Sequence, residues 1–540
     1  MKNNNFNIKH IFAALTFLCG ILILNFNLNA ENAAGNNAAQ KLSFEVENTA
    51  AQKPNFEVEN IAAQKTSFEV GNIATQKLSL EVENTAAQKA SKLNISISSS
   101  NGQNCSPLLD GSYSSSVAFS DDTTVTVTSG TTMYGIYLIW DLPAVEWTLA
   151  YGNTSKKCGT NGFLHEYVSI PEGAASCTIT FSKAVRLSDI SCYSNGILPN
   201  DVQVWEPSCE KADILAFSTH ADDEILFLGG PLVTYGSRSD VDVQVVYMCE
   251  FWSTQKIREH EKLDGLWECG IRHYPVNGSF KDLYSMSLDA ALKQYNYDDL
   301  VEFVTEQIRR FKPQVCITQD LNGEYGHGGH RILSKAFCEA VDKCSQTDFC
   351  TDSAKKYGVY SVPKAYLHLY EQGKINLNLR TPIEALENRT GLEVLKSAYK
   401  KHVSQQRWWF YVSDEYEYSC ASFGLYHTTV GADSGNDMLE HIVTYKTQAE
   451  LAAKAEQERI EASIAASIAE SVSIDESIKE AQREAEELMR IEEAQHRARN
   501  LRMAATICIV IAVAAAITII ITRRRRFNFH PRSARKKQRK

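Results

Sequence analysis

Apolar and polar residues alternate through the part of the chain between residues 92 and 208. The alternation is clearest at 124–128 (Thr-Val-Thr-Val-Thr), 133–140 and 177–181. Such a pattern puts successive side chains on opposite faces of a strand that is buried on one side. Several short strands of this kind, separated by Ser, Thr and Gly and without helical periodicity, predict a β-sandwich over residues 92–208.

Longer apolar runs alternate with helical periodicity between residues 209 and 445. Helical spacing of apolar positions occurs at 254–269 and 298–311, which end before a glycine and a proline. Strands that alternate with helices are typical of a mostly parallel sheet covered by helices, so we expect a Rossmann-like α/β domain here. The runs that predict its buried strands are 214–218, 241–249, 315–319 and 364–370.

A third pattern extends from residue 446 to 502, where the chain is rich in Ala, Glu, Ile, Lys and Arg and has no Gly or Pro. It predicts a helical stalk about 85 Å long at ~1.5 Å per residue. Isoleucines recur on one face without a sustained heptad, which leaves self-association of the stalk as a coiled coil open. Residues 503–522 carry no charged side chain. A stretch of this length is sufficient to cross a bilayer and predicts one transmembrane helix.

Both ends of the chain are typical of targeting segments. Residues 1–30 combine two early lysines with an apolar run and end at Ala30, as a secretory signal peptide does. Residues 31–91 repeat a twelve-residue unit with too few apolar residues for a core, and we interpret them as a linker rather than a solenoid. Residues 523–540 are strongly basic. The positive-inside rule then predicts a single-pass protein of the cell membrane, with its N-terminal part extracellular and this tail cytoplasmic.

Composition narrows the classes of function. The net charge is −10, and because the basic tail is included in that value, the rest of the chain is more acidic still. An acidic surface argues against nucleic acid as a partner. Of the 14 cysteines, Cys19 and Cys508 lie in the predicted signal and span, and the even number that remains is compatible with disulfides. Since no Cys-x-x-Cys pair occurs, a thiolate zinc site has little support.

Candidate metal ligands follow the first apolar strand of the α/β segment. Residues 213–218 lead directly into His220-Ala221-Asp222-Asp223-Glu224, and His327-Gly-Gly-His330 comes much later. Open α/β sheets bind ligands at the carboxyl ends of their strands. A hydrolytic metal ion needs a few neutral or anionic ligands, an open position for water and a nearby base. His220, Asp223 and His330 would supply two imidazoles and one carboxylate, and Asp222 the base.

A simpler interpretation is that the acidic run only caps a helix. Asp222, Asp223 and Glu224 stand where the next helix would begin, and its free N–H groups and dipole favour anionic side chains. Histidines three residues apart also often share a helix face. A histidine at the end of a buried strand, combined with the later His-x-x-His, favours the metal site over the cap.

These motifs resemble those of the PIG-L (LmbE-like) zinc-dependent N-deacetylases. That family has His-Pro-Asp-Asp-Glu after its first strand and Gly-Tyr-Gly-His-Pro-Asp-His later. This chain has residues 220–224 followed by Gly229-Gly230, and then Gly323-Glu-Tyr-Gly-His-Gly-Gly-His330. The similarity covers most of residues 209–445 and implies an LmbE-like fold; it extends through Asp320, Arg258 with Glu261, and the stretches 402–405 and 423–426.

The resemblance implies the metal site and the reaction. It makes His220, Asp223 and His330 the ligands of Zn²⁺, with another divalent cation as the alternative, and Asp222 the general base for the attacking water. Ala221 takes the place of the family's proline and removes no ligand. The implied enzyme is a zinc-dependent amidohydrolase that removes an N-acetyl group from an N-acetylglucosamine-type sugar or glycoconjugate at the cell surface.

The resemblance also implies roles around the amide. His327 would support the oxyanion and protonate the leaving amine, and Tyr325 would polarise the acyl carbonyl. Arg258 would contact the substrate, although a salt bridge to Glu261 on a helix surface is an alternative. The chain departs from the family pattern at Gly329, where members have an Asp that can orient the first histidine of the pair.

Other interpretations remain open. Residues 110–114, 138–141 and 202–205 resemble parts of a discoidin-like (galactose-binding-like) module, so the β-sandwich would be either a carbohydrate binder or a spacer. Two histidines and a carboxylate also suit an iron oxygenase, although such sites usually lie in β-barrels. The last alternative is an inactive surface protein that binds glycan, against which the presence of every ligand and of the base argues.

Overall fold

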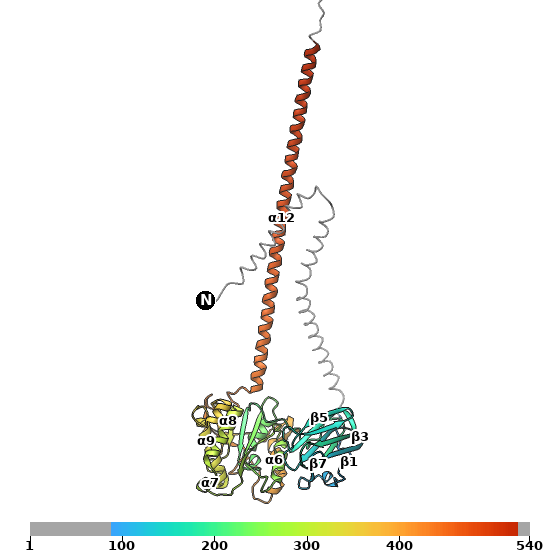
Figure 1. Cartoon of the computed structure of the whole chain (residues 1–540). Helices are drawn as coiled ribbons and strands as arrows, with labels where there is room; N and C mark the ends of the chain where they lie inside the picture. The colour runs from blue at the N-terminus through green and yellow to red at the C-terminus, as the bar shows by residue number, and fades with distance from the viewer. Residues whose placement is uncertain (1–87, 527–540) are drawn as a thin grey trace, which may run out of the picture.

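The computed structural model describes residues 88–526, apart from the side chains at 514, 517, 518 and 520–526 (Figure 1). The predicted signal peptide at 1–30, the repeat segment up to residue 87 and the tail from 527 onward lie outside the described residues. An all-β unit and an α/β unit pack side by side, and one long helix extends away from them.

The first unit consists of strands and one short 3-10 helix, η1 (Ser106–Leu109). The first half of β3 pairs with β1 and its second half with β7, and register shifts between Thr128 and Gly135 separate the two halves. The prediction of an all-β unit is confirmed. However, the strands form one continuous sheet rather than two, because the long strands β3 and β6 pass bulges and continue. The strands are β1 (Ile95–Ser99), β2 (Val117–Phe119), β3 (Thr124–Trp140), β4 (Trp147–Tyr151), β5 (Thr154–Cys158), β6 (His165–Phe181) and β7 (Val185–Tyr193).

The second unit is built on a mostly parallel sheet, as predicted. Its strand order is β10-β9-β8-β11-β12-β16-β13. The strands from β10 to β12 are parallel, and β16 and β13 add an antiparallel edge. The chain moves outward from β8 to β10 and then returns to the other side of β8 at β11. A ligand crevice is expected where the strand order reverses in this way. The strands are β8 (Ile214–Ser218), β9 (Val243–Glu250), β10 (Val276–Lys281), β11 (Val315–Thr318), β12 (Lys364–His368), β13 (Lys374–Asn376) and β16 (Ser422–Thr428).

Helices cover this sheet, and α8 illustrates why they form where they do. Its apolar residues Leu300, Val304 and Ile308 are buried at helical spacing. The helix ends at Lys312, which is left-handed (φ 44°) and precedes a proline. The helices are α4 (Asp223–Leu226), α5 (Gly229–Gly236), α6 (Ile257–Glu268), α7 (Leu288–Gln294), α8 (Tyr297–Phe311), α9 (Gly328–Lys343), α10 (Thr351–Tyr357) and α11 (Gly391–Lys401). Shorter elements are η2 (Glu324–Gly326), η3 (Glu384–Leu386), η4 (Val403–Gln405), β14 (Pro382–Ile383) and β15 (Arg389–Thr390).

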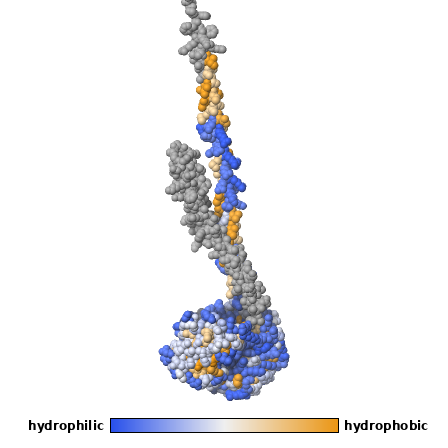
Figure 2. Space-filling model, turned by 90° about the vertical axis from the view of Figure 1, so that its right-hand side faces the viewer, coloured by the Kyte–Doolittle hydropathy of each residue, from blue (hydrophilic) through white to orange (hydrophobic). Residues whose placement is uncertain are grey.

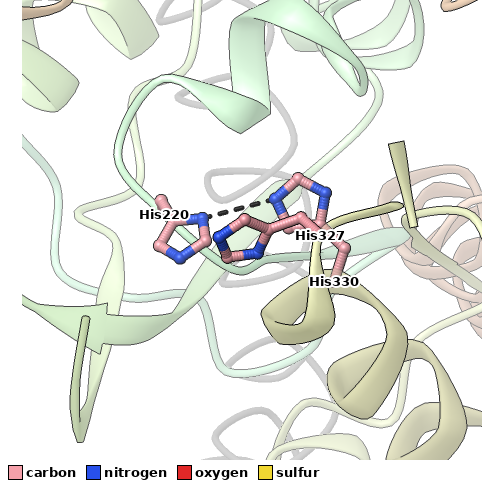
Figure 3. A group of neighbouring side chains, drawn as sticks. All are labelled: His220, His327 and His330. Atoms are coloured by element: carbon pink, nitrogen blue, oxygen red, sulfur yellow. Dashed lines mark hydrogen bonds between the residues drawn. The ribbon is translucent and has the colours of Figure 1, made fainter. Parts of the chain in front are cut away.

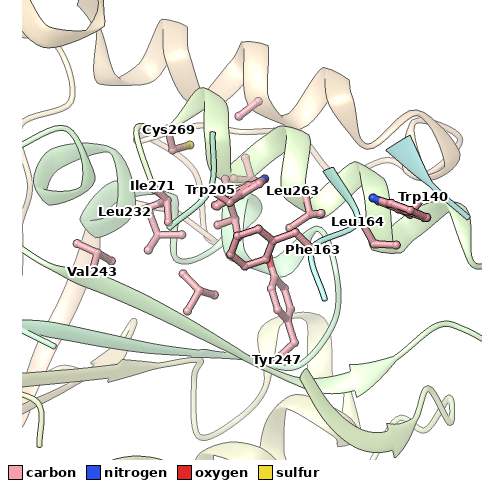
Figure 4. Packing of buried hydrophobic residues seen from close by; sticks show 14 of the residues in the cluster. Trp140, Phe163, Leu164, Trp205, Leu232, Val243, Tyr247, Leu263, Cys269 and Ile271 are labelled. Atoms are coloured by element: carbon pink, nitrogen blue, oxygen red, sulfur yellow. The ribbon is translucent and has the colours of Figure 1, made fainter. Parts of the chain in front are cut away.

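The two units share one hydrophobic core (Figure 4). Phe163 of the all-β unit stacks on Tyr274 with ring centroids 4.6 Å apart, and the Leu164 N–H donates to the Tyr274 hydroxyl (3.0 Å). A buried hydrogen bond of 2.9 Å joins His165 Nε2 to Nδ1 of His260 on α6. The β unit is therefore docked on α6 and is part of the same folded body. All cysteines in the described part of the chain are free thiols.

Helix α12 (Tyr445–Arg526) leaves this body from the α/β unit. Its first turn is fixed by Tyr445, whose N–H donates to Asp213 Oδ1 (2.8 Å) and whose hydroxyl donates to the Lys312 carbonyl (2.6 Å). Beyond it the described side chains are exposed, and apolar and hydrophilic stretches alternate (Figure 2). Within residues 88–526 no helix has a stretch long and apolar enough to cross a bilayer, so the span predicted at 503–522 is not supported. The location of the chain stays a prediction.

Candidate active site

The turn after β8 places the first candidate residues. β8 is buried along its whole length, and the Ser218 hydroxyl donates to the His220 carbonyl (3.0 Å), which stabilises a tight turn before α4. Asp222 has a φ of 133°, a value that residues with a side chain rarely adopt. Its N–H donates to Glu224 Oε2 (2.7 Å), but its own side chain makes no capping bond to α4. The simple capping interpretation therefore does not hold for Asp222.

The three predicted metal ligands converge at the end of β8. His220 Nδ1 lies 2.8 Å from Asp223 Oδ2, His330 Nε2 lies 3.1 Å from the same oxygen, and the two nitrogens are 3.3 Å apart. Ligand atoms at ~2.0–2.1 Å from a tetrahedral zinc ion are ~3.3–3.4 Å from one another. The three atoms thus already form a triangle close to one face of a tetrahedral site. We call His220, Asp223 and His330 the ligand triad.

A third imidazole completes the cluster. Ring nitrogens of His220, His327 and His330 all lie within 4.8 Å of one another (Figure 3). Burial alone would lower the pKa of His330, but the carboxylates of Asp223 and Glu324 raise it to about 9. Burial would raise the pKa of Asp223, yet His330 and His220 keep it well below its usual value. The donor set of two imidazoles and one carboxylate therefore fits a divalent cation.

A buried carboxylate orients His330 from behind. Glu324 Oε2 accepts from His330 Nδ1 (2.7 Å), and Glu324 Oε1 accepts from His368 Nδ1 (2.6 Å). His368 in turn uses Nε2 toward the Ser419 carbonyl (2.9 Å). With its Nδ1 proton directed to Glu324, His330 would bind a cation through Nε2 once the proton on that nitrogen is released. Burial would raise the pKa of Glu324, but the two histidines lower it to about 2.

Asp282 approaches the same centre from the loop after β10. Its Oδ1 lies 3.4 Å from His220 Nε2 and its Oδ2 lies 3.5 Å from Arg258. His220 Nε2 is buried and has no hydrogen bond of normal geometry. The contact between His220 and Asp282 is therefore an ion pair rather than a hydrogen bond. Burial would raise the pKa of Asp282, whereas His220 and Arg258 lower it to about 2.

Arg258 on α6 holds the predicted base. The side chain is buried and donates to Asp222 Oδ1 (2.7 Å) and to the Ala221 carbonyl (2.5 Å), and it stacks on Phe251 at 4.1 Å. The alternative of a surface salt bridge to Glu261 is wrong. Burial raises the pKa of Asp222 to about 6, and the Arg258 guanidinium opposes that rise.

His327 begins α9 and takes its orientation from the backbone. Its Nδ1 accepts from the Gly329 N–H (3.1 Å), so the proton of the neutral ring is on Nε2. A Cβ at position 329 would lie 3.1 Å from Nδ1, which is closer than most such contacts. Because glycine has no Cβ, the His327 ring can approach the Gly329 N–H without a clash. Burial and the neighbouring histidines His220 and His330 lower the pKa of His327 to about 3. The backbone N–H therefore stands where family members use an Asp.

These groups line a pocket of about 580 Å³. Tyr325 faces it from a left-handed position (φ 47°) and packs on Phe410, with ring centroids 4.6 Å apart. All seven residues predicted for the site contribute to the pocket or contact a residue that does. The lining residues are His220, Asp222, Asp223, Leu226, Phe227, Gln255, Arg258, Asp282, Tyr284, Met286, Tyr325, His327, Gln405, Arg407, Trp408, Trp409 and Phe410.

Sequence reasoning did not identify three of the polar contacts. Glu324 lies in the motif at 323–330, three residues before its first histidine, and the sequence assigns it no role, although its carboxylate orients His330. Asp282 lies in a loop, and His368 ends β12 far along the chain. Only the fold brings these two residues to the ligand triad.

Comparison with known proteins identifies the central segment. Residues 215–341 match the family model described as PIG-L: GlcNAc-PI de-N-acetylase. A curated relative, 1D-myo-inositol 2-acetamido-2-deoxy-alpha-D-glucopyranoside deacetylase from Rhodococcus erythropolis, is 25% identical over 200 residues, which are 32% of this chain and 67% of the relative. The resemblance to the PIG-L family is confirmed for this segment.

Two solved structures are similar to parts of the chain. N,N'-diacetylchitobiose deacetylase from Pyrococcus horikoshii is 16% identical and covers 35% of this chain and 70% of its own, with a TM-score of 0.28. A carbohydrate-binding module from a family 31 glycoside hydrolase of Clostridium perfringens is 9% identical and covers 20% of this chain and 95% of its own, with a TM-score of 0.16.

Proposed function

Because residues 215–341 match the PIG-L family, we propose that the chain is a metal-dependent hydrolase that removes the acetyl group from an N-acetylglucosamine-type sugar or glycoconjugate. The observation that carries the proposal is the ligand triad at the pocket, with the carboxylate of Asp222 beside it. In this reaction water adds to the acetyl carbonyl, the C–N bond breaks, and acetate and a free amine are released.

The ligand triad would hold a divalent cation such as Zn²⁺ and leave a coordination position open. When bound, such a cation lowers the pKa of water and stabilises negative charge on the acyl oxygen. Neighbouring carboxylates would orient the two histidine ligands. Glu324 fixes the tautomer of His330, and Asp282 lies next to Nε2 of His220, the ring nitrogen that faces away from Asp223.

The remaining residues would handle protons and charge. Arg258 engages Oδ1 of Asp222, which leaves Oδ2 to accept the proton of the attacking water. His327 carries its proton on Nε2 and would donate it in a hydrogen bond to the oxyanion. Because the pKa of His327 is lowered to about 3, the ring is neutral and has no second proton to give away, so the proton that Asp222 takes from the water would pass to the leaving amine. Tyr325 would donate its hydroxyl proton to the acyl oxygen, because burial keeps the pKa of that hydroxyl well above its usual value.

The test is acetate release from a panel of N-acetylated glycans, with and without a chelator. We expect wild-type activity that the chelator removes. Asp222→Asn should lower kcat by ~10²–10⁴-fold, the usual contribution of a positioned base, while metal content measured by elemental analysis is unchanged. Asp342→Asn is the matched control, since Asp342 is an exposed residue of α9 whose one hydrogen bond in the described contacts is to Tyr426, outside the pocket.

Two outcomes would contradict the proposal. If the wild type binds the metal but releases no acetate from any glycan, the chain is not a deacetylase of these sugars, and an inactive surface protein is the better interpretation. If activity survives both the chelator and Asp222→Asn, the ligand triad is not the reactive centre.

A further inference from the structure

The mouth of the active-site pocket is lined by aromatic side chains that are exposed. Trp408 and Trp409 are 53% and 59% exposed, and Tyr284 on a different loop is 72% exposed. Tryptophan is normally among the more buried residues, and adjacent exposed aromatic side chains usually mark a binding surface. We call these three residues the aromatic rim.

The exposure of the aromatic rim does not result from a loose loop. The loop that carries the tryptophans begins at η4, where the Ser404 N–H and hydroxyl donate to the two oxygens of Glu261 (2.7 and 2.6 Å). Gln405 is buried and donates to the Ser404 hydroxyl (2.8 Å). Since Glu261 belongs to α6, the base of the loop is fixed to the helix that also carries Arg258.

The aromatic rim is continuous with the reactive centre. Tyr325 packs on Phe410 at 4.6 Å, and Phe410 packs on Trp409 at 4.1 Å. On the other side, Tyr284 contacts His327 edge-on at 5.6 Å. Trp409 is therefore two ring contacts from Tyr325, a separation suited to the sugar ring next to the one that is deacetylated.

We propose that Trp408 and Trp409 form a stacking subsite for a neighbouring sugar residue, so that the substrate is an N-acetylated oligosaccharide or polysaccharide rather than a single sugar. This inference rests on the proposed function. Pyranose rings present flat faces of C–H groups, and indole rings present flat, electron-rich faces that attract them. Tyr284, which lines the same pocket from another loop, would contact the glycan next to His327.

The charges at the pocket favour a neutral glycan over an anionic lipid headgroup. Besides histidine, the basic residues that line the pocket are Arg258 and Arg407. Arg258 is already engaged by Asp222 and Asp282, and Arg407 lies beside the ring of Trp408 at 5.2 Å. A surface that binds anionic lipid usually gathers several free cations around its aromatic residues.

The test compares deacetylation of β-1,4-linked N-acetylglucosamine oligomers of increasing length, from the monomer upward. For the wild type we expect kcat/KM on the trimer to exceed that on the monomer by about tenfold, the factor that corresponds to ~1.4 kcal/mol of stacking. Trp409→Ala and Trp408→Ala should each reduce this trimer-to-monomer ratio several-fold, chiefly through KM. Ile197→Ala, at a side chain that is equally exposed (59%) but outside the pocket, should leave the ratio unchanged.

Two further variants identify the occupant. Trp409→Tyr keeps a flat ring and should retain most of the ratio, whereas Trp409→Leu keeps apolar area without a flat face and should lose it. If Trp409→Leu behaves as the wild type, and the wild type but not Trp409→Ala sediments with phosphatidylinositol vesicles, the aromatic rim binds lipid and the glycan subsite is refuted.

The remaining outcomes separate this inference from the proposed function. Equal kcat/KM on monomer and trimer, unchanged by the tryptophan variants, would refute the subsite and leave the deacetylase standing. If no oligomer releases acetate but the trimer quenches tryptophan fluorescence and the monomer does not, the subsite stands and the deacetylase proposal fails. If no oligomer releases acetate and none quenches tryptophan fluorescence, both the subsite and the deacetylase proposal are refuted.

Discussion

Glu324 is the residue on which the geometry of the ligand triad depends most. It is fully buried, and each of its carboxylate oxygens accepts from one imidazole. We predict that Glu324→Gln weakens binding of Zn²⁺ by ~10–100-fold, because an amide presents only one acceptor and no longer fixes His330. Competition with a chromogenic chelator measures this affinity. Glu339→Gln, on the exposed side of α9, should bind Zn²⁺ as the wild type does, and equal affinities for the two variants would contradict the assigned role.

At the level of single residues, the sequence identified what local chain geometry determines. His220 and Asp223 are three positions apart in one turn, so their proximity follows from the end of a buried strand. His330 required the additional assumption that β8 and β11 are neighbours. Asp282 and His368 could not be found, because a lone acid in a loop and a histidine at the end of an apolar strand carry no local signal. The unusual φ of Asp222 could not be predicted either, because the turn that contains it is bonded to Arg258 on a distant helix as well as to the neighbouring Glu224.

Among the elements, α5 shows how closely the α/β unit is packed. The Gly230 N–H donates to the Cys420 carbonyl (3.1 Å), and a Cβ at position 230 would lie 2.2 Å from that oxygen. We predict that Gly230→Ala destabilises the fold by about 1–3 kcal/mol, as overpacking against backbone does. Gly130→Ala is the control because a Cβ there meets nothing within 4 Å. Urea unfolding of both variants gives the comparison, and equal midpoints would contradict the predicted clash.

Helix α6 carries a titratable group at its contact with the β unit. Asp264 accepts from the Tyr113 hydroxyl (3.2 Å) and from Gln203 Nε2 (2.5 Å), and burial raises its pKa from 3.8 to about 6. Between these pH values the unfolded chain releases its proton first, so this group makes folding less favourable as the pH rises.

The corresponding prediction concerns the variant Asp264→Asn, which keeps an acceptor but does not titrate. Its free energy of unfolding should increase relative to that of the wild type as the pH rises from about 4 to 6, and the difference should be constant above that range. Unfolding midpoints measured across this range test it. A difference that does not vary with pH would mean that Asp264 titrates alike in both states.

The central elements of the α/β unit were predictable because their patterns are long. The run 214–218 coincides with β8, and the periodic stretch 298–311 coincides with α8 to within one residue. The edge strand β13 and its neighbour β16 were not predicted, because strands that are partly exposed lack a continuous apolar run. In the β unit, alternation located strands but could not show that β3 changes partners midway.

For the whole molecule, the described contacts between helix α12 and the folded body lie in the first turn of the helix. We predict that ending the chain after residue 450 changes the melting temperature by less than ~2 °C, because no buried contact is lost. Ending it after residue 443 should lower the melting temperature further, since both hydrogen bonds of Tyr445 disappear at about 1 kcal/mol each. Scanning calorimetry distinguishes the two chains. If the two shortened chains lose the same amount of melting temperature, the part of α12 beyond residue 450 also stabilises the fold.

The relation between the two units was the part least accessible to sequence reasoning. Composition separated an all-β segment from an α/β segment and suggested independent modules. In the structure they share a core in which Phe163 and Trp205 pack on Tyr274 and Trp267. Such a contact depends on the shapes of both surfaces, which no single-segment pattern encodes.

Helix α6 presents Arg258 and Glu261 to the catalytic side and His260 and Asp264 to the β unit. Successive residues of an α-helix are turned by ~100° about its axis. Inserting or deleting one amino acid within this helix would therefore rotate one set of contacts out of phase with the other. The β unit is therefore not an independent module that another domain could replace. A replacement domain would have to fit the shape of α6 and contact the same face of that helix.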